Sequence, residues 1–341
     1  IPPATLQKAL SEHPDARAVM LVCPTYYGVC GNVAAIAQLC HQHHIPLLVD
    51  EAHAAHFAFH PDLPTPALRA GADLVVQSTH KTLSALTQAA MLHIQGDRID
   101  ADRLSQSLAL VQSTSPSYLL LASLDAARHQ MATQGKELLQ QTLTLADQAR
   151  IAINQMPGLS TLNPEQATSP GFMALDRTRL TVTVSGLGLD GFTTDEIFCQ
   201  QGIVAELPSL HHLTFIVSPG TTEADVERLV QAFRQLQQTK PTQTPGGVPN
   251  LCHFPLPDSP PSCLSPRAAF HAPAVRLPIH QAIHRISAEL VCPYPPGIPV
   301  LLPGEVVTEA AIAYLHQILA LGGTISGCSD CTLQTLKIIQ N

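Results

Sequence analysis

The sequence predicts an α/β protein in which a mostly parallel, buried sheet precedes two smaller α+β units. From residue 1 to about 135, short β-rich runs alternate with amphipathic stretches, which is the pattern of strands joined by helices. The pattern changes near Leu180, and a later segment rich in Pro and Thr has the composition of a linker. We therefore expect a large α/β domain at 1–140, a small α+β domain at 141–237, a linker at 238–262 and a C-terminal α+β domain at 263–341.

In the large domain, four apolar runs of strand length predict the strands of the sheet, at 18–23, 45–49, 72–77 and 89–95. Residues 33–43 have the spacing of an amphipathic helix. Apolar residues at helical spacing continue over residues 118–155, with no proline before Pro157. This stretch predicts one long helix, or two, leading out of the sheet layer.

The small domain is predicted from a second alternation of strands and helices. A strand and turn over 180–191 is followed by a helix over 193–202 that starts at a Thr cap. Two further strands are expected at 203–207 and 213–220, and a helix at 222–236 closes the domain.

The composition places the chain among globular proteins, because 45% of its residues are hydrophobic and 13% are charged. A formal charge of -8 leaves no basic surface for nucleic acid. No run approaches the roughly 18–20 apolar residues of a membrane span, and the start lacks the pattern of a secretory signal. Nine scattered Cys, an odd number, indicate reduced thiols rather than a disulfide framework. We expect a soluble, cytoplasmic protein.

Two side chains at predicted strand ends carry the chemistry. Asp50 ends one predicted strand and Lys81 follows another, so both are expected to face the crevice at the carboxyl edge of the sheet. A carboxylate for a pyridine nitrogen and a lysine that forms an imine are the two groups that pyridoxal phosphate chemistry needs. Ser78, Thr79 and His80 supply hydroxyl and imidazole groups suited to the cofactor phosphate.

Through this segment, the chain closely resembles the Orn/Lys/Arg decarboxylase family, whose fold is of the aspartate aminotransferase type (PLP-dependent transferase-like, fold type I). The resemblance extends to PTYYG (24–28), STSPSY (113–118) and ELVCPYPPGIPVLLPGE (289–305). It implies that Lys81 is the Schiff-base lysine and that Asp50 partners the pyridine nitrogen. It also implies that Ala52, with His53 close by, lies under the cofactor ring, and that Ser78 and His80 hold the phosphate.

The resemblance further implies a reaction, a partner and a substrate site. The reaction is the pyridoxal phosphate-dependent decarboxylation of lysine, arginine or ornithine to the corresponding amine and carbon dioxide, with Lys81 or a nearby His such as His53 as the proton donor. Thr114 and Ser115 are expected to reach the cofactor phosphate of a neighbouring subunit in a homodimer or larger homo-oligomer. Glu289 and Tyr294, in the C-terminal domain, are candidates for contact with the substrate.

The start of the chain departs from the family. Its first residue is Ile, and the match begins partway through the large domain, without the phosphate loop and the stacking residue that the family resemblance implies ahead of it. We therefore expect a large domain that is incomplete at its N-terminus. An inactive or split family member acting as a binding or scaffold subunit is the alternative reading.

The same residues allow other structural and functional interpretations. Asp50 could cap a helix. Asp50, His53, His56 and His60 could bind a metal, although their spacing is not a zinc pattern, and no metal is expected. Cys328 and Cys331 form a CxxC without a second pair, which favours ordinary thiols at a turn. LLVDEAH resembles the Walker B box of DEAH helicases, but no GxxxxGK[ST] motif precedes it, so the helicase reading is discarded.

Overall fold

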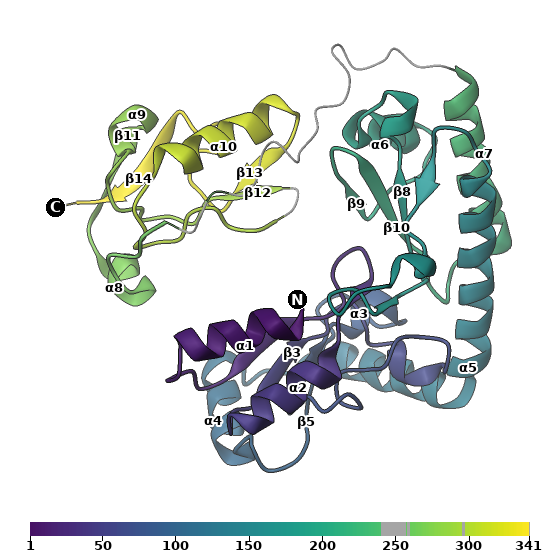
Figure 1. The fold of residues 1–341 in the computed structure, drawn as a ribbon, viewed down its shortest axis with the longest axis horizontal. Coiled ribbons are helices and arrows are strands. Elements are labelled where there is room, and N and C mark those ends of the chain that lie inside the picture. The colour runs from purple at the N-terminus through teal and green to yellow at the C-terminus, as the bar shows by residue number, and fades with distance from the viewer. Residues whose placement is uncertain (240–256, 258–259, 295–296, 341) are drawn as a thin grey trace. The chain divides into compact units, whose positions relative to one another are not determined.

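A computed structural model of the chain describes residues 1–239, 257, 260–294 and 297–340 (Figure 1). The chain forms two compact units, one of residues 1–183 and 214–240 and the other of residues 184–213 and 241–341. Most of the predicted linker 238–262 lies outside the described residues. The predicted domain bounds therefore stay a prediction.

The first unit contains a four-stranded sheet in the order β1-β3-β4-β5. Its strands are β1 (Val19–Val22), β3 (Leu47–Asp50), β4 (Leu74–Gln77) and β5 (Met91–Ile94). The first three run parallel and β5 runs antiparallel to β4. The four predicted strands and the mostly parallel sheet are thus confirmed.

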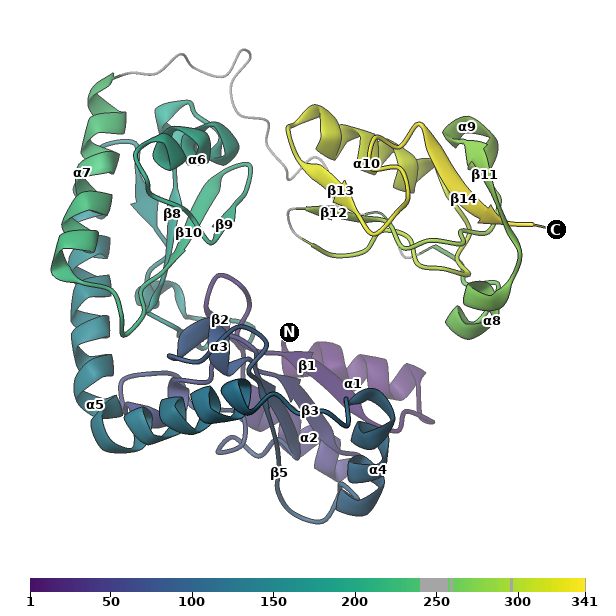
Figure 2. The same cartoon turned by 180° about the vertical axis from the view of Figure 1, so that it is seen from behind.

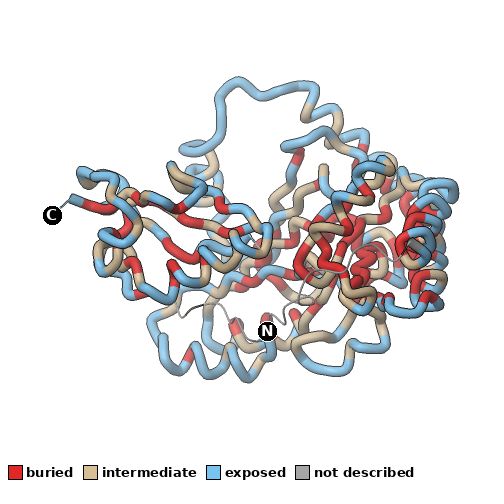
Figure 3. Tube along the Cα trace, turned by 90° about the horizontal axis from the view of Figure 1, so that it is seen from above, coloured by how far each residue is buried: buried red, intermediate tan, exposed pale blue. Residues whose placement is uncertain are grey.

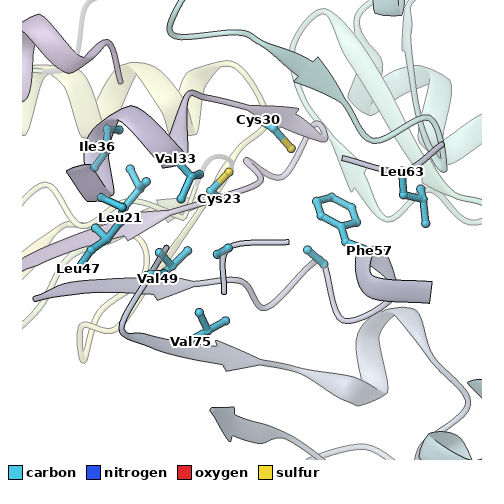
Figure 4. Packing of buried hydrophobic residues seen from close by; sticks show 14 of the residues in the cluster. Leu21, Cys23, Cys30, Val33, Ile36, Leu47, Val49, Phe57, Leu63 and Val75 are labelled. Atoms are coloured by element: carbon cyan, nitrogen blue, oxygen red, sulfur yellow. The ribbon is translucent and has the colours of Figure 1, made fainter. Parts of the chain in front are cut away.

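Helices α1 (Pro3–Glu12) and α2 (Val33–Gln42) lie on one face of this sheet (Figure 1). Helix α2, predicted at 33–43, begins where the Asn32 side chain accepts a hydrogen bond from the Ala35 N–H. Its buried residues Val33, Ile36, Ala37 and Cys40 recur at helical spacing and form one apolar stripe. They pack against the sheet in the core shown in Figure 4, which also includes Leu21, Leu47, Val49, Phe57 and Val75. Burying each Leu or Ile side chain contributes roughly 1.5–3 kcal/mol.

Figure 2 shows the sheet from its opposite face, with α1 and α2 behind the strands, and apolar residues of β1 are exposed. Met20 is 72% exposed and Val22 is 59% exposed. Val22 pairs with Asp50 and Asp50 pairs with Val76, so these three residues form one row across the sheet. Asp50 therefore shares its face with exposed residues rather than with the core.

Residues 118–155, predicted to form one helix or two, form the single helix α5 (Tyr118–Asn154), capped by Ser117. Helix α4 (Ala101–Val111) precedes it. Where α5 passes the short helix η1 (Phe57–Phe59), Gln140 Oε1 lies 3.2 Å from His60 Nε2. Further along, the Arg150 guanidinium donates hydrogen bonds to the carbonyl oxygens of Arg177 and Arg179. One helix thus holds two distant segments of the unit.

A second set of strands brings residues 174–183 to the site. Strand β7 (Ala174–Leu175) pairs antiparallel with β2 (Val29–Cys30). Strand β8 (Arg179–Thr183) lies between β6 (Ser160–Thr161) and β10 (His212–Ile216), and α7 (Glu223–Thr239) packs on α5. The predicted strands at 180–191 and 213–220 and the helix at 222–236 are confirmed, with shifted ends. The short helices of this unit are α3 (Thr79–Thr82) and η2 (Pro164–Gln166).

Two predictions for residues 185–208 are corrected. The helix expected at 193–202 is α6 (Gly191–Gln200), and its cap is Asp190 rather than a Thr, because the Asp190 carboxylate accepts the Thr193 N–H. The strand expected at 203–207 is reduced to β9 (Leu207–Pro208). The Ile203 N–H bonds to the Phe198 carbonyl and the Ala205 N–H to the Asp195 carboxylate, so these donors serve α6 instead of a sheet. Helix η3 is Ser185–Leu187.

Described residues from 260 onward form helices around two small antiparallel strand pairs, β11 with β14 and β12 with β13. The elements in chain order are α8 (Pro266–His271), β11 (Ala274–Pro278), α9 (Ile279–Ala282), β12 (Cys292–Tyr294), α10 (Glu309–Ala320), β13 (Thr324–Ser326) and β14 (Thr335–Ile339). Their core includes Leu301, Leu315 and Leu336, and Figure 3 marks such buried stretches in red.

Gly28 is required where the turn before β2 meets the segment before β8. Its φ is +86°, and a Cβ built there would lie 2.9 Å from Arg179 Cβ and 3.0 Å from the Asp176 carbonyl oxygen. We expect Gly28→Ala to lower the free energy of unfolding by at least about 2 kcal/mol in urea denaturation, because strain and a backbone clash add together.

Gly96→Ala is the matched control, because Gly96 also has a positive φ, +70°, but has no atom within 4 Å of a built Cβ. Gly96→Ala should lower the free energy of unfolding by the conformational cost of the positive φ alone, about 1–2 kcal/mol. Equal losses in the two variants would show that the packing of Gly28 against Arg179 contributes nothing.

Candidate active site

Asp50 and Lys81 leave the sheet at the same edge. Asp50 is the last residue of β3, and Lys81 lies in α3, directly after the neighbouring parallel strand β4. The Asp50 carboxylate accepts a hydrogen bond from the Ala52 N–H at 3.0 Å, which closes the turn after β3. The structure thus brings both predicted residues to the carboxyl edge of the sheet, where parallel sheets bind ligands.

His53 links Lys81 to the interior of the first unit. Its Nε2 lies 3.4 Å from Lys81 Nζ, and its ring contacts the Tyr26 ring at a centroid distance of 4.4 Å. On the other side, His53 Nδ1 lies 2.8 Å from Arg179 Nη2. His53 is 6% exposed, whereas Lys81 is exposed. The imidazole therefore sits between an exposed amine and a buried guanidinium.

Behind His53 lies a cluster of buried polar side chains. Asp176 Oδ2 is 3.2 Å from His56 Nε2 and 3.8 Å from Arg179 Nε. Thr178 donates its backbone N–H and its hydroxyl to Asp176 Oδ1. All four side chains are buried, so the Asp176 carboxylate balances the positive charge of Arg179 in a region with little water.

The electrostatics of the cluster follow from burial and these charges. Burial, together with the nearby positive charges of Arg179 and Lys81, lowers the pKa of His53 to about 3. Burial disfavours the ionised form of Asp176, but His56 and Arg179 outweigh it and hold the pKa of Asp176 below its usual value. His53 is therefore neutral at neutral pH, while Asp176 is ionised.

The lowered pKa of His53 predicts a pH dependence of stability. A folded-state pKa of about 3 against an ordinary value of 6.5 means that neutral His53 contributes its full stability above pH 6.5. That contribution declines as the pH falls from 6.5 toward 3, because the unfolded chain takes up the proton first. We expect the unfolding free energy of the wild type to fall more between pH 7 and 4 than that of His53→Gln. The surface variant His13→Gln should follow the wild type, and parallel curves for all three proteins would contradict the assignment.

The other predicted site residues are less closely grouped. Ser78 precedes α3 without capping it, and His80 Nδ1 lies 2.9 Å from the Ala89 carbonyl oxygen, which leaves Nε2 available. Thr114 and Ser115 are exposed in the loop between α4 and α5. No contact ties this loop to Lys81, so its role stays a prediction.

Glu289 and Tyr294 belong to the second unit. The Glu289 carboxylate accepts hydrogen bonds from the Ser329 N–H, the Ser329 hydroxyl and the Lys337 N–H. These contacts bind β14 and the preceding loop to the segment before β12. Tyr294 is 40% exposed. Contact of either residue with a substrate stays a prediction.

Three residues of the site were missed by sequence reasoning: Tyr26, Asp176 and Arg179. Tyr26 lies in the PTYYG stretch, but nothing local tells that its ring meets His53. A signal for Arg179 was present, because it directly precedes the strand that the sequence predicts from Leu180, and this strand is buried. A charged residue at such a position is expected to have a buried partner.

The described residues also bear on the metal and thiol alternatives. No group of three or more His, Cys, Asp or Glu side chains there could hold a metal ion. Instead, His56 contacts Asp176 and His60 contacts Gln140. Cys328 and Cys331 are free thiols. Within the same described part of the chain, no helix has the length and apolarity to cross a membrane.

Solved structures with the same arrangement define the class of fold. The lysine decarboxylase of Francisella novicida superposes with a TM-score of 0.81 at 23% identity, over 100% of this chain and 61% of that one. The constitutive lysine decarboxylase of E. coli gives 0.77 at 19% identity, over 99% of this chain and 60% of that one. The predicted fold class, the PLP-dependent transferase-like fold of type I, is confirmed.

Sequence comparison then gives the family. Residues 1–225 match the model of the Orn/Lys/Arg decarboxylase major domain, and residues 260–329 match that of its C-terminal domain. The chain therefore belongs to the Orn/Lys/Arg decarboxylase family, as the resemblance predicted. Arginine decarboxylases of Bacillus subtilis and Halalkalibacterium halodurans are each 38% identical to it, over 98% of this chain and 68% of the relative.

The chain spans about two thirds of the length of these relatives, 68% of the arginine decarboxylases and 61% of the Francisella enzyme. The family and the relatives support decarboxylation of a basic amino acid as the activity of this chain. The alternative of a binding or scaffold subunit is not favoured by them.

Proposed function

We propose that this chain uses pyridoxal phosphate to decarboxylate a basic amino acid, and that arginine is its substrate. The observation that carries the proposal is the placement of Asp50 and Lys81 after two adjacent parallel strands, at one edge of the sheet. Relatives with 36–38% identity are named arginine decarboxylases, while two relatives named lysine decarboxylases are 24% identical, which supports arginine.

The donor groups at this edge fit the cofactor. Lys81 offers an exposed amine, and Asp50 offers a carboxylate on the open face of the sheet. Ser78 and His80 lie at the start of α3, where a hydroxyl and the remaining imidazole nitrogen could bind phosphate oxygens. Bound pyridoxal phosphate supplies an aldehyde for the lysine amine and a ring that accepts the electron pair of the broken carbon–carboxylate bond.

In this proposal each side chain has one task. Lys81 would hold the cofactor through its aldehyde and would release that aldehyde to the amino group of the substrate, becoming a free amine again. Asp50 keeps a negative charge beside the ring nitrogen, which stabilises the protonated ring. Ala52, which follows the turn closed by Asp50, and His53 line the space next to these two groups. Glu289 remains a proposed partner for the distal cation of the substrate.

The test is an absorption spectrum of the full chain with pyridoxal phosphate, followed by borohydride reduction and peptide mass mapping. We expect the reduced cofactor on the peptide that contains Lys81, and carbon dioxide release from carboxyl-labelled arginine in preference to lysine and ornithine. Labelling scattered over surface lysines would overturn the cofactor assignment. Labelling at Lys81, with carbon dioxide released only from lysine or ornithine, would overturn arginine as the substrate and leave the cofactor assignment standing.

We also propose a homo-oligomer, at least a dimer, in which the loop of Thr114 and Ser115 meets a neighbouring subunit. Apolar side chains flank this loop in exposed positions: Leu110 is 87%, Val111 82% and Tyr118 80% exposed. Such clustering marks interaction surfaces. We expect Leu110→Lys with Tyr118→Lys to shift the wild-type dimer toward monomer in sedimentation velocity. A wild-type monomer at micromolar concentration would contradict this proposal.

A further inference from the structure

We propose that Arg179 is a positioning residue that fixes His53 as the neutral tautomer with its proton on Nε2, so that His53 presents an N–H group to Lys81. The tautomer follows from contacts within the first unit alone. Its consequence for the reaction rests on the proposed function, in which Lys81 is the attachment lysine.

The first step is the contact between Arg179 and His53. A guanidinium carries only hydrogen-bond donors and stays protonated in proteins. Since Arg179 Nη2 lies 2.8 Å from His53 Nδ1, the imidazole nitrogen must be the acceptor. An accepting Nδ1 carries no proton, so the proton of the neutral ring is on Nε2.

Arg179 is held in place from three sides. It is fully buried, and its backbone carbonyl accepts a hydrogen bond of 2.9 Å from Arg150 Nη2 of α5. Its Nε lies 3.8 Å from Asp176 Oδ2, and its Cβ and Cγ pack on Gly28. Because the side chain has little room to move, its donor stays directed at His53.

The second step concerns the other ring nitrogen. Nε2 lies 3.4 Å from Lys81 Nζ and, in this tautomer, bears the proton. When Lys81 is unprotonated, its nitrogen has a lone pair to which His53 can donate, and in this tautomer His53 cannot accept a proton from it. Among the described residues, the charged and titratable groups that face His53 are Lys81, Arg179, Asp176, His56 and Tyr26. Asp176 is the only carboxylate in this set, and it is already engaged by His56, Thr178 and Arg179.

The consequence is a division of roles at the site. His53, which the family resemblance offered as a possible proton donor, orients the Lys81 nitrogen instead of exchanging protons with it. Of the two proton donors that the resemblance names, Lys81 and His53, this leaves Lys81. The low pKa of His53, about 3, is in keeping with a ring that stays neutral throughout the working pH range.

The direct test is two-bond proton–nitrogen correlation NMR on the full chain with 15N-labelled histidine and no cofactor. The His53 signals are assigned by their loss in His53→Gln. We expect an unprotonated Nδ1 and a protonated Nε2 from pH 5 to 8. A proton on Nδ1, or a doubly protonated ring, in the wild type would overturn the proposal whatever the variants do.

Substitutions of Arg179 test whether this residue sets the tautomer of His53. Arg179→Met removes the donor, and we expect both tautomers to appear and the midpoint of the His53 titration to rise by roughly one pH unit or more. Arg179→Lys keeps a charged donor and should retain the Nε2–H tautomer at least in part. Arg128→Met, on the exposed face of α5, is the matched control and should leave the His53 signals unchanged.

The outcomes distinguish a failure of the tautomer proposal from a failure of the proposed function. If Arg179→Met does not fold, the wild-type spectrum and Arg179→Lys still decide the tautomer. A single Nε2–H tautomer retained in folded Arg179→Met would show that Arg179 does not set it. Because no cofactor is present in these measurements, a failed Lys81 label after borohydride reduction would overturn the proposed function and leave the tautomer assignment standing.

Discussion

Replacing Lys81 by alanine is expected to abolish both cofactor attachment and turnover, with carbon dioxide release reduced by at least about three orders of magnitude. Lys81 is the residue that the sheet delivers to the carboxyl edge beside Asp50 as a primary amine, and alanine leaves no nucleophile there. The measurement is single-turnover release of labelled carbon dioxide, together with mass mapping after borohydride reduction.

The fold should tolerate this change. Lys81 is exposed and, among the described residues, its Nζ has one long contact, to His53, so the free energy of unfolding should change by less than about 0.5 kcal/mol. Lys136→Ala, at an exposed position of α5, is the control and should keep both label and turnover. A Lys81→Ala protein that still carries reduced cofactor on one specific lysine would refute the assignment.

Replacing Asp50 by asparagine is expected to separate cofactor attachment from chemistry. Asparagine retains an oxygen that can accept the Ala52 N–H, so the turn after β3 is preserved while the negative charge is removed. We expect labelling at Lys81 to persist and turnover to fall by at least about 100-fold, because the ring loses the carboxylate that keeps it protonated.

Two further variants serve as controls for the Asp50→Asn result. Asp102→Asn removes an equivalent charge from an exposed position of α4 and should leave turnover within twofold of the wild type, since surface substitutions of this kind are nearly neutral. Asp50→Ala removes the charge and the acceptor together and should lose at least as much turnover. Normal rates in Asp50→Asn would mean that another group serves the ring nitrogen.

Sequence reasoning predicted the sheet well because its signals are local. Each strand of the first sheet is a short apolar run, and the helix at 33–42 shows its buried stripe in the spacing of its residues. The strand predicted at 203–207 was wrong because its hydrogen bonds are set by a neighbouring helix and not by its own residues. The apolar run there has strand composition, but its N–H groups are taken by Phe198 and Asp195 of the preceding helix.

Only the part of the site that depends on local sequence signals was predicted. Asp50 and Lys81 could be placed together because the edge of a parallel sheet follows from strand order. The contact of His53 with Arg179 joins residues 126 positions apart and depends on the pairing of β2 with β7, two strands of two residues each. Strands that short leave almost no pattern in a sequence, so the cluster around Asp176 was found only in the structure.

Helix α5 sets a constraint on how this chain can vary. Gln140 holds the His60 turn and Arg150 holds the start of β8, ten residues or about 15 Å apart at the rise of an α-helix. Exposed positions between them can change freely, but inserting one residue would rotate Arg150 by about 100° around the helix axis. This part of α5 should therefore admit substitutions at its exposed positions while rejecting insertions and deletions, because its length sets where Arg150 points relative to Gln140.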